Sequence, residues 1–399
     1  MSGRAMSGRG FRPWLAASTA SVFGDSVTFF AIGWAAAGFG ADAASLVLTI
    51  ESIPLAVLVL AGGVLADRVG IRRTMVACDA AMVLVMAAFA VCAIGGAELW
   101  MLVVVGALSG TLQALRRPAE GVFPRLFGTA DLDRRMALVG SAHQIARTAG
   151  PAAGGFLLGH GGLPLTAGLD AATFGLVLIA LLLVRPPHEP APEPGQGSVW
   201  RSLADGARAA RRTPGVVPVL IAITGLAVTV LPLVMLALPL AGRERAWTAA
   251  ETGLVSGAWV AGGLVMTLFV ARRGAPPAPV ACAGPVIAAA GVGVLALRTE
   301  VWAGVLAIGL VGVGTTMLTT YLFPVFVART PPEMLARFSS LTQLAQTGPV
   351  LVATPLLGAA AGFDVRLPLV VVGALLLATV PAALRAARID TPRGLIHER

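Results

Sequence analysis

Long apolar stretches dominate this sequence and recur twelve times along its 399 residues. A helix needs about 20 consecutive, mostly apolar residues to cross the hydrocarbon core of a bilayer, and each stretch is close to that length. The stretches that we expect to span a membrane are 13–39, 43–66, 74–95, 98–115, 136–159, 163–184, 215–241, 250–271, 278–297, 301–327, 338–361 and 366–387. The sequence therefore predicts an all-α, multi-pass membrane protein with twelve transmembrane helices in the lipid bilayer.

The composition argues against several other classes of protein. All 29 basic residues are arginines, so there is no lysine for a phosphate-binding P-loop or a Schiff base. Three cysteines, four histidines and one tyrosine leave little for a disulfide scaffold, a metal site or acid–base chemistry. A net charge of +9 with 57% hydrophobic residues does not fit a soluble nucleic-acid-binding protein. We expect neither an enzyme nor a cofactor, metal or nucleic-acid partner.

The arginines are distributed unevenly over the connections between the predicted spans. One set of alternate connections, together with both termini, holds 24 arginines, whereas the other set holds four, Arg243, Arg245, Arg298 and Arg366. Arginine-rich connections stay on the cytoplasmic side. We therefore expect both termini in the cytoplasm and the protein in the inner (cytoplasmic) membrane. The near-duplicate MSGR at 1–4 and 6–9 leaves Met1 and Met6 both open as the start.

The second half of the chain repeats features of the first. In each half a pair of glycines precedes a pair of arginines at the same spacing, at Gly62–Gly63 with Arg72–Arg73 and at Gly262–Gly263 with Arg272–Arg273. A shift of six helices preserves the topology, so this pattern predicts a parallel repeat. The predicted domains are two six-helix bundles, at 1–184 and at 215–399.

Residues 185–214 would join the two bundles on the cytoplasmic side. Prolines fill the first part, which favours an extended chain. After Ser198, apolar residues recur at helical spacing with arginines between them. Two interpretations stay open: a short amphipathic helix on the inner membrane surface, or a solvated linker helix.

The turn between the second and third spans carries spaced glycines, an acid and several arginines. This signature loop contains Gly63, Asp67, Arg68, Gly70, Arg72 and Arg73. Such side chains can form ion pairs and can bind the end of a neighbouring helix. Contacts of this kind can be made in one conformation and broken in another, which is a conformational switch. Alternatively, the arginines only anchor the loop to the membrane surface. Asp79, in the third span, is expected to pair with the loop arginines.

The pattern Gly-x-x-x-Asp-Arg-x-Gly-x-Arg-Arg resembles the signature loop of the major facilitator superfamily. This resemblance, supported by twelve spans in two halves, covers nearly the whole chain. It implies two pseudo-symmetric six-helix bundles that alternate access to a central site. It also implies that Asp67 and the loop arginines latch the two halves together in the outward-facing state.

The fifth span carries a proline among small residues, at Gly150, Pro151, Gly154 and Gly155. Proline bends a helix and small residues allow close helix contact, so ordinary kinked packing is one interpretation. The run also resembles the antiporter motif of exporters in the same superfamily, with Ala146 where the first glycine is usual. The stretch from Arg117 to Pro124 resembles the bacterial branch that holds siderophore and macrolide exporters.

Charges inside the predicted spans need a reason, because each costs about 2.5–3.5 kcal/mol at the bilayer centre on insertion scales. Asp25 and Arg147 are expected at a similar depth. Either they pair, as a static or a functional ion pair, or Asp25 lines the cavity and takes up a proton. Glu51 is a candidate second proton site or a structural partner. For Asp170, we favour a role in packing or helix capping.

Three glutamines in the predicted spans are candidate substrate contacts, or else hydrogen-bond between helices: Gln113, Gln144 and Gln343. Taken together, the sequence predicts a monomeric secondary active transporter that exports an amphipathic small molecule (a drug, antibiotic or siderophore) in exchange for protons. One alternative is an uptake symporter on the same fold. A second is a membrane receptor or enzyme that transports nothing.

Overall fold

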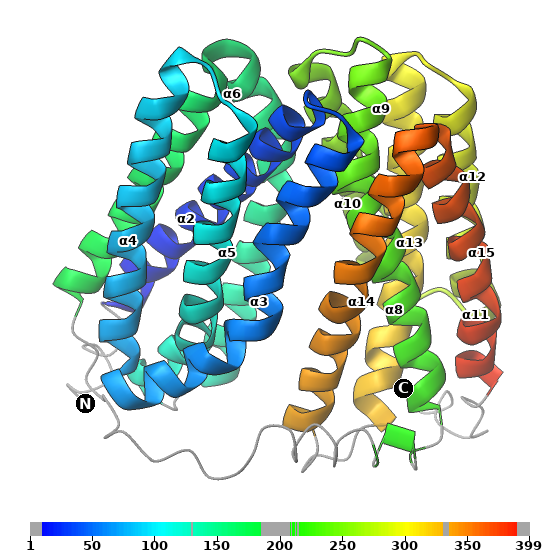
Figure 1. The fold of residues 1–399 in the computed structure, drawn as a ribbon. Helices are drawn as coiled ribbons and strands as arrows, with labels where there is room; N and C mark the ends of the chain where they lie inside the picture. The colour runs from blue at the N-terminus through cyan, green and yellow to red at the C-terminus, as the bar shows by residue number, and fades with distance from the viewer. Residues whose placement is uncertain are drawn as a thin grey trace. The chain divides into compact units, whose positions relative to one another are not determined.

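The computed structural model describes residues 10–128, 131–184, 208, 210–211, 213, 215–329 and 335–388. Most of the predicted linker helix therefore lies outside the described residues. The side chains of some residues within these ranges, including Asp67 and Gln343, are also outside the description. Apart from short turns, the described chain is helical (Figure 1).

Five long helices make up the first half of the chain. Short 3-10 segments extend two of them, at Ala93–Gly95 and Phe123–Phe127. The helices are α2 (Phe11–Ala37), α3 (Ala41–Val69), α4 (Ile71–Cys92), α5 (Leu99–Val122) and α6 (Leu132–Leu183). Gly162 interrupts α6 with a φ of 65° and a ψ of −165°, a conformation that glycine adopts without steric cost. It divides α6 into two successive spans.

The second half has the same kind of architecture. Its first span, the seventh of the chain, contains a π-helical turn, Leu233–Ala237, directly after Pro232. The helices are α8 (Val216–Pro232), α9 (Leu238–Glu244), α10 (Ala249–Arg273), α11 (Ala278–Cys282), α12 (Gly284–Leu297), α13 (Val301–Arg329), α14 (Leu335–Phe363) and α15 (Arg366–Arg388).

These helices confirm the predicted fold class. Within the described residues, ten helical segments are long and apolar enough to cross a membrane, and one of them is the double-length α6. Together with α3, they account for the twelve spans. The predicted end of the fourth span at 115 is wrong, because α5 continues to Val122. The boundary was placed at the charge of Arg116, yet that side chain is buried and paired with acids, so the helix continues.

The chain divides into two compact units. Unit 1 contains residues 1–196 and 242–257, and unit 2 contains residues 197–241 and 258–399. The segment 242–257, which joins α9 to α10, thus belongs with the first half of the chain. The domain boundaries predicted from the sequence stay a prediction.

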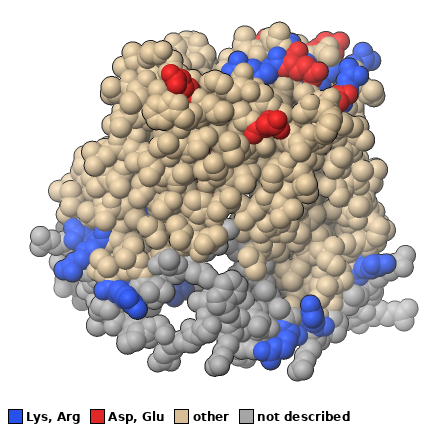
Figure 2. All heavy atoms as spheres, in the orientation of Figure 1, with Lys and Arg blue, Asp and Glu red and all other residues tan. Residues whose placement is uncertain are grey.

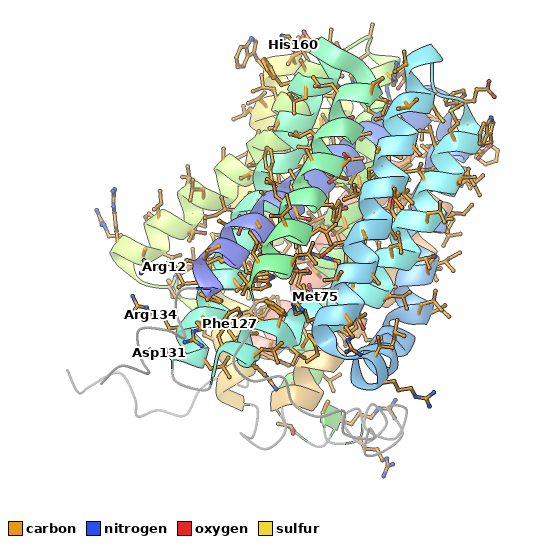
Figure 3. All side chains as sticks on the ribbon, turned by 90° about the vertical axis from the view of Figure 1, so that its left-hand side faces the viewer. Arg12, Met75, Phe127, Asp131, Arg134 and His160 are labelled. Carbon is orange, nitrogen blue, oxygen red and sulfur yellow. The ribbon has the colours of Figure 1, made fainter. Side chains whose placement is uncertain are left out.

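Within unit 1, α2 packs against α6, α3 packs against α5, and α4 packs against both α5 and α6. Figure 1 shows α2 crossing its neighbours at a steep tilt. A buried aromatic cluster that includes Phe11, Trp14, Phe123 and Phe127 fixes one end of this unit. Figure 3 places Arg12 and Arg134 at the same end, which we call the arginine-rich end.

The surface charge agrees with a membrane environment. On the face drawn in Figure 2, the lower helix ends carry arginines, the upper ends carry both basic and acidic residues, and a band between the two ends is uncharged. Such a band fits the hydrocarbon core of a bilayer, where an exposed charge is costly.

Within unit 2, α12 packs against α13 and α15, and α8 packs against α14 and α15.

Candidate functional site

A polar pocket lies inside unit 1, where α2, α5 and both parts of α6 meet. Helix α5 supplies four of its side chains, because residues three and four apart share one face of a helix. The pocket is lined by Ser21, Val22, Asp25, Gln113, Arg116, Arg117, Glu120, Arg147 and Phe174. A charged pocket in a membrane-embedded bundle is the default candidate for a functional site.

Arg116 is the centre of a buried ion-pair network. Its Nε donates to Asp79 Oδ1 at 2.5 Å, and its Nη1 donates to Glu120 Oε2 at 2.8 Å. The exposed fraction of the side chain is 6% for Arg116 and 0% for Asp79. In this conformation Asp79 thus pairs with Arg116 of α5 rather than with an arginine of the signature loop. Asp79 lies two turns into α4, about 12 Å along the helix from its start, and faces α5.

Gln113 connects Asp25 to Arg117. The Nε2 of Gln113 donates to Asp25 Oδ1 at 3.1 Å, and Arg117 Nη2 donates to Gln113 Oε1 at 2.8 Å. The amide thus links the guanidinium to the carboxyl group in a chain of two hydrogen bonds. Such bonds polarise and strengthen each other in a low-dielectric interior. Of the three predicted substrate-contact glutamines, Gln113 lines the pocket.

Arg147 lines the pocket with Asp25, but the two form no ion pair in the part of the chain that the structure describes. The hypothesis that Asp25 and Arg147 form an ion pair therefore does not hold in this conformation. The position of Asp25 in the pocket lining agrees with the alternative, that it lines a cavity. One turn before Arg147, His143 Nε2 lies 3.1 Å from Ser18 Oγ. That contact ties α6 to α2 beside the pocket.

The remaining candidate residues lie outside the pocket lining. Glu51 is half-buried in α3, and its Oε2 has no hydrogen-bond partner in the described structure. Gly110 of α5 lies against the Glu51 backbone, so the two helices are in close contact there. Gln144 is exposed and donates to Thr148 Oγ1 at 3.2 Å. The side chain of Gln343 is outside the description.

The signature loop is partly described. Gly70 has a φ of 101°, which lets a single residue separate α3 from α4. Arg72 donates from Nε to Leu181 O at 2.8 Å and from Nη2 to Leu182 O at 3.2 Å. These bonds satisfy carbonyls at the negative end of α6. Arg68 and Arg73 are exposed, and nothing is described of the Asp67 side chain.

The glycines of the fifth-span motif are contact points between helices. A side chain at Gly150 would collide with Ser26 of α2, and one at Gly154 would meet the Val27 carbonyl. A side chain at Gly155 would collide with Gly253, at the start of α10 within unit 1. These positions therefore require small residues for close packing.

Sequence reasoning missed Arg116, Arg117 and Glu120 as site residues because it assigned the two arginines to a connection. The available signal was the spacing: Gln113 with Arg117, and Arg116 with Glu120, are four residues apart on a helix. No group of three or more histidine, cysteine, aspartate or glutamate side chains in the described ranges is placed to hold a metal ion.

Solved structures with the same fold are transporters. A bacterial homologue of the iron transporter ferroportin, in an inward-facing state, matches with a TM-score of 0.71 and 17% identity, over 95% of this chain and 98% of that chain. The nucleoside transporter NupG matches with a TM-score of 0.68 and 13% identity, over 96% and 100%. A bacterial homologue of the human drug peptide transporters PepT1 and PepT2 gives 0.69 and 13%, over 96% and 98%.

A comparison with curated protein sequences found no match. The family model described as Major Facilitator Superfamily matches residues 14–354. That range includes the signature loop, the pocket and helices of both halves. The chain belongs to the major facilitator superfamily of membrane transporters.

Proposed function

We propose that the protein is a secondary active exporter that exchanges protons for an amphipathic small molecule such as a drug, an antibiotic or a siderophore. It would lie in the inner membrane as a monomer with both termini in the cytoplasm. The observation that carries the proposal is the position of Asp25. Its carboxyl group lines a polar pocket and is hydrogen-bonded by the neutral amide of Gln113 rather than paired with an arginine.

In this proposal, Asp25 accepts a proton when the pocket opens to the outside. Protonation removes one negative charge from a pocket that also holds Arg117 and Arg147. The change in charge alters the affinity for substrate, which is the condition for coupling two ligands. Release of the proton to the cytoplasm restores the carboxylate, and the substrate leaves by the opposite path.

The switch between the two states would use the other two motifs. The bonds from Arg72 to the end of α6 hold the signature loop within the first half, and the exposed Arg68 and Arg73 would form the contact that is made in one state and broken in the other. The glycine contacts of the fifth span, at Gly150 and Gly155, let helices approach closely without side chains in the way. Rocking of two six-helix halves about a central site then gives alternating access.

The test is transport in membrane vesicles of both orientations, with a fluorescent amphipathic dye as the probe. We expect inside-out vesicles to accumulate the dye when a proton gradient is imposed, and an uncoupler to abolish this. Asp25→Asn should remove the dependence on the gradient. Asp42→Asn, an exposed acid at the start of α3, is the matched control and should behave as the wild type.

Two outcomes would contradict the proposal. Proton-driven accumulation in right-side-out vesicles alone would indicate the uptake symporter instead. Unchanged flux and unchanged pH dependence in Asp25→Asn would remove Asp25 from proton coupling.

A further inference from the structure

Asp170 is a carboxyl group sealed inside unit 1, in the second part of α6. Its exposed fraction is 0%, and its Oδ2 has no hydrogen-bond partner in the described part of the structure. The other oxygen, Oδ1, lies 3.4 Å from the Thr173 hydroxyl, which makes a shorter bond of 2.9 Å to the backbone carbonyl of Asp170. The polar neighbours of the carboxyl group are therefore the hydroxyls of Thr173 and Thr28, which carry no charge.

A comparison with Asp79 shows how unusual this environment is. Both side chains are fully buried, but Asp79 is paired with the guanidinium of Arg116. Arg116 forms ion pairs with Asp79 and with Glu120, and neither pair includes Asp170. A buried carboxylate without a cation is costly, and the group avoids this cost by holding a proton.

Asp170 also lies next to the proposed proton site. Its Oδ1 is against the backbone of α2 at Gly24, where an added Cβ would come within 2.9 Å, and Gly24 is followed directly by Asp25. One turn further along α2, Thr28 Oγ1 donates to Thr166 O of α6 at 3.1 Å. The two helices thus meet at Gly24 and again one turn further along α2.

Several groups face this position from the helices packed around it. Helix α2 contributes Asp25 and Thr28, and α5 contributes Arg116, whose guanidinium lies over the ring of Phe174, one turn beyond Asp170. Helix α4, which also packs on α6, carries Cys78 and the paired Asp79. Asp25 is the acid that acts electrostatically on Asp170, so the charge states of these two carboxyl groups are linked.

We propose that Asp170 is a second proton-binding residue, linked to Asp25 across the contact between α2 and α6. This inference depends on one part of the proposed function, the exchange of protons at Asp25. Like charges in a low-dielectric interior repel each other, so a negative charge on Asp25 disfavours one on Asp170. The protons of the two groups then come off in two steps that belong to the pair rather than to either residue.

Infrared spectroscopy of the purified full-length protein tests this directly. A protonated buried carboxyl group has a C=O stretching band apart from those of ionised carboxylates. We expect such a band in the wild type, its loss on alkaline titration, and its absence in Asp170→Asn. In Asp25→Asn the pH midpoint of the Asp170 band should move by about one pH unit, the coupling expected of interacting sites. Asp42→Asn should leave the band unchanged.

The proposal is overturned if Asp170→Asn and the wild type give the same spectrum. It is also overturned if the band does not titrate, or if Asp25→Asn leaves its midpoint in place, because Asp170 would then be a static neutral group. If Asp170→Asn fails to fold, Asp170→Glu keeps a carboxyl group at this position and should shift the band, and an unchanged band in that variant overturns the proposal. Failure of proton-driven export in vesicles would refute the proposed function without affecting these spectra.

Discussion

The helices of the two halves differ in where they carry charge. In the first half, charged side chains lie deep within helices, as with Asp25, Asp79, Arg147 and Asp170. In the helices of the second half, from α8 to α15, every charged residue lies within four positions of a helix end. Since both halves form six-helix bundles, the fold does not need these internal charges. They point instead to a function concentrated in the first half.

Polar hydrogen bonds follow the same division. In unit 1, side chains reach across helices, from Gln113 to Asp25 and from Thr28 to the Thr166 carbonyl. In unit 2, several described threonine hydroxyls bond back to a carbonyl of their own helix, as Thr229 does with Gly225. Such local bonds satisfy the hydroxyl without joining one helix to another.

The two halves do share their backbone packing. Gly62 of α3 lies against the backbone of α5 at Ala114, and Gly262 of α10 lies against the backbone of α13 at Gly309. The second and fourth spans of each half therefore meet at equivalent glycines. Glycine contacts between helices are therefore common to both halves, whereas the charges that lie deep within helices are in the first half.

The strongest test of this comparison is the removal of Arg116. Arg116→Met leaves Asp79 and Glu120 buried without their cation, and breaking a buried ion pair costs about 3–5 kcal/mol. We expect a drop of that size in the free energy of unfolding, measured by denaturant titration of the protein in detergent micelles.

A triple variant, Arg116→Met with Asp79→Asn and Glu120→Gln, provides the control. It removes the charges together and should recover much of the lost stability. If the single variant is as stable as the wild type, the network does not hold α4 and α5 together. The buried charges of the first half would then not contribute to its stability.

The fold was largely predictable from the sequence because apolar length alone determines a membrane span. The candidate functional site was less predictable than the fold. Asp25 and Gln113 stood out as polar residues in apolar stretches, whereas Arg116 and Arg117 looked like the end of a span. Arg116 pairs with Asp79 on another helix, and Arg117 is linked to Asp25 through Gln113. No local pattern reveals which acid of a distant segment lies near a given arginine.

The glycine contacts test the shared part of the comparison. Gly62→Val and Gly262→Val each force a side chain against a neighbouring backbone, and overpacking of this kind costs about 1–3 kcal/mol. We expect similar losses of stability in the two halves, measured by the same titration. Gly175→Val and Gly293→Val are matched controls, since nothing lies within 4 Å of a Cβ added at either position. A large loss at only one of Gly62 and Gly262 would contradict the structural repeat.

A smaller effect is expected at Arg243, in the segment of the second half that belongs to unit 1. Its guanidinium lies 4.3 Å from the centroid of the Trp34 ring and donates to the Trp34 carbonyl at 3.1 Å. Arg243 is exposed, where a cation–π contact contributes about 0.5–1 kcal/mol. Arg243→Ala should lower the unfolding free energy by about that amount, and Trp34→Leu should reduce the effect of Arg243→Ala to that of the hydrogen bond, because the backbone carbonyl at position 34 still accepts. Additive losses in the double variant would show that the two side chains do not interact.

The smallest effect should come from a hydroxyl of the second half. Trp259 Nε1 donates to Thr315 Oγ1 at 3.4 Å, and Thr315 also bonds to the Val311 carbonyl of its own helix at 2.8 Å. Hydrogen bonds between membrane helices average about 0.6 kcal/mol, and this one is long, so Thr315→Val should cost no more than that by the same titration. Because valine preserves the shape, the measurement isolates the polar contact. A loss comparable to that of Arg116→Met would mean that the second half also depends on its polar contacts, and the division between the halves would fail.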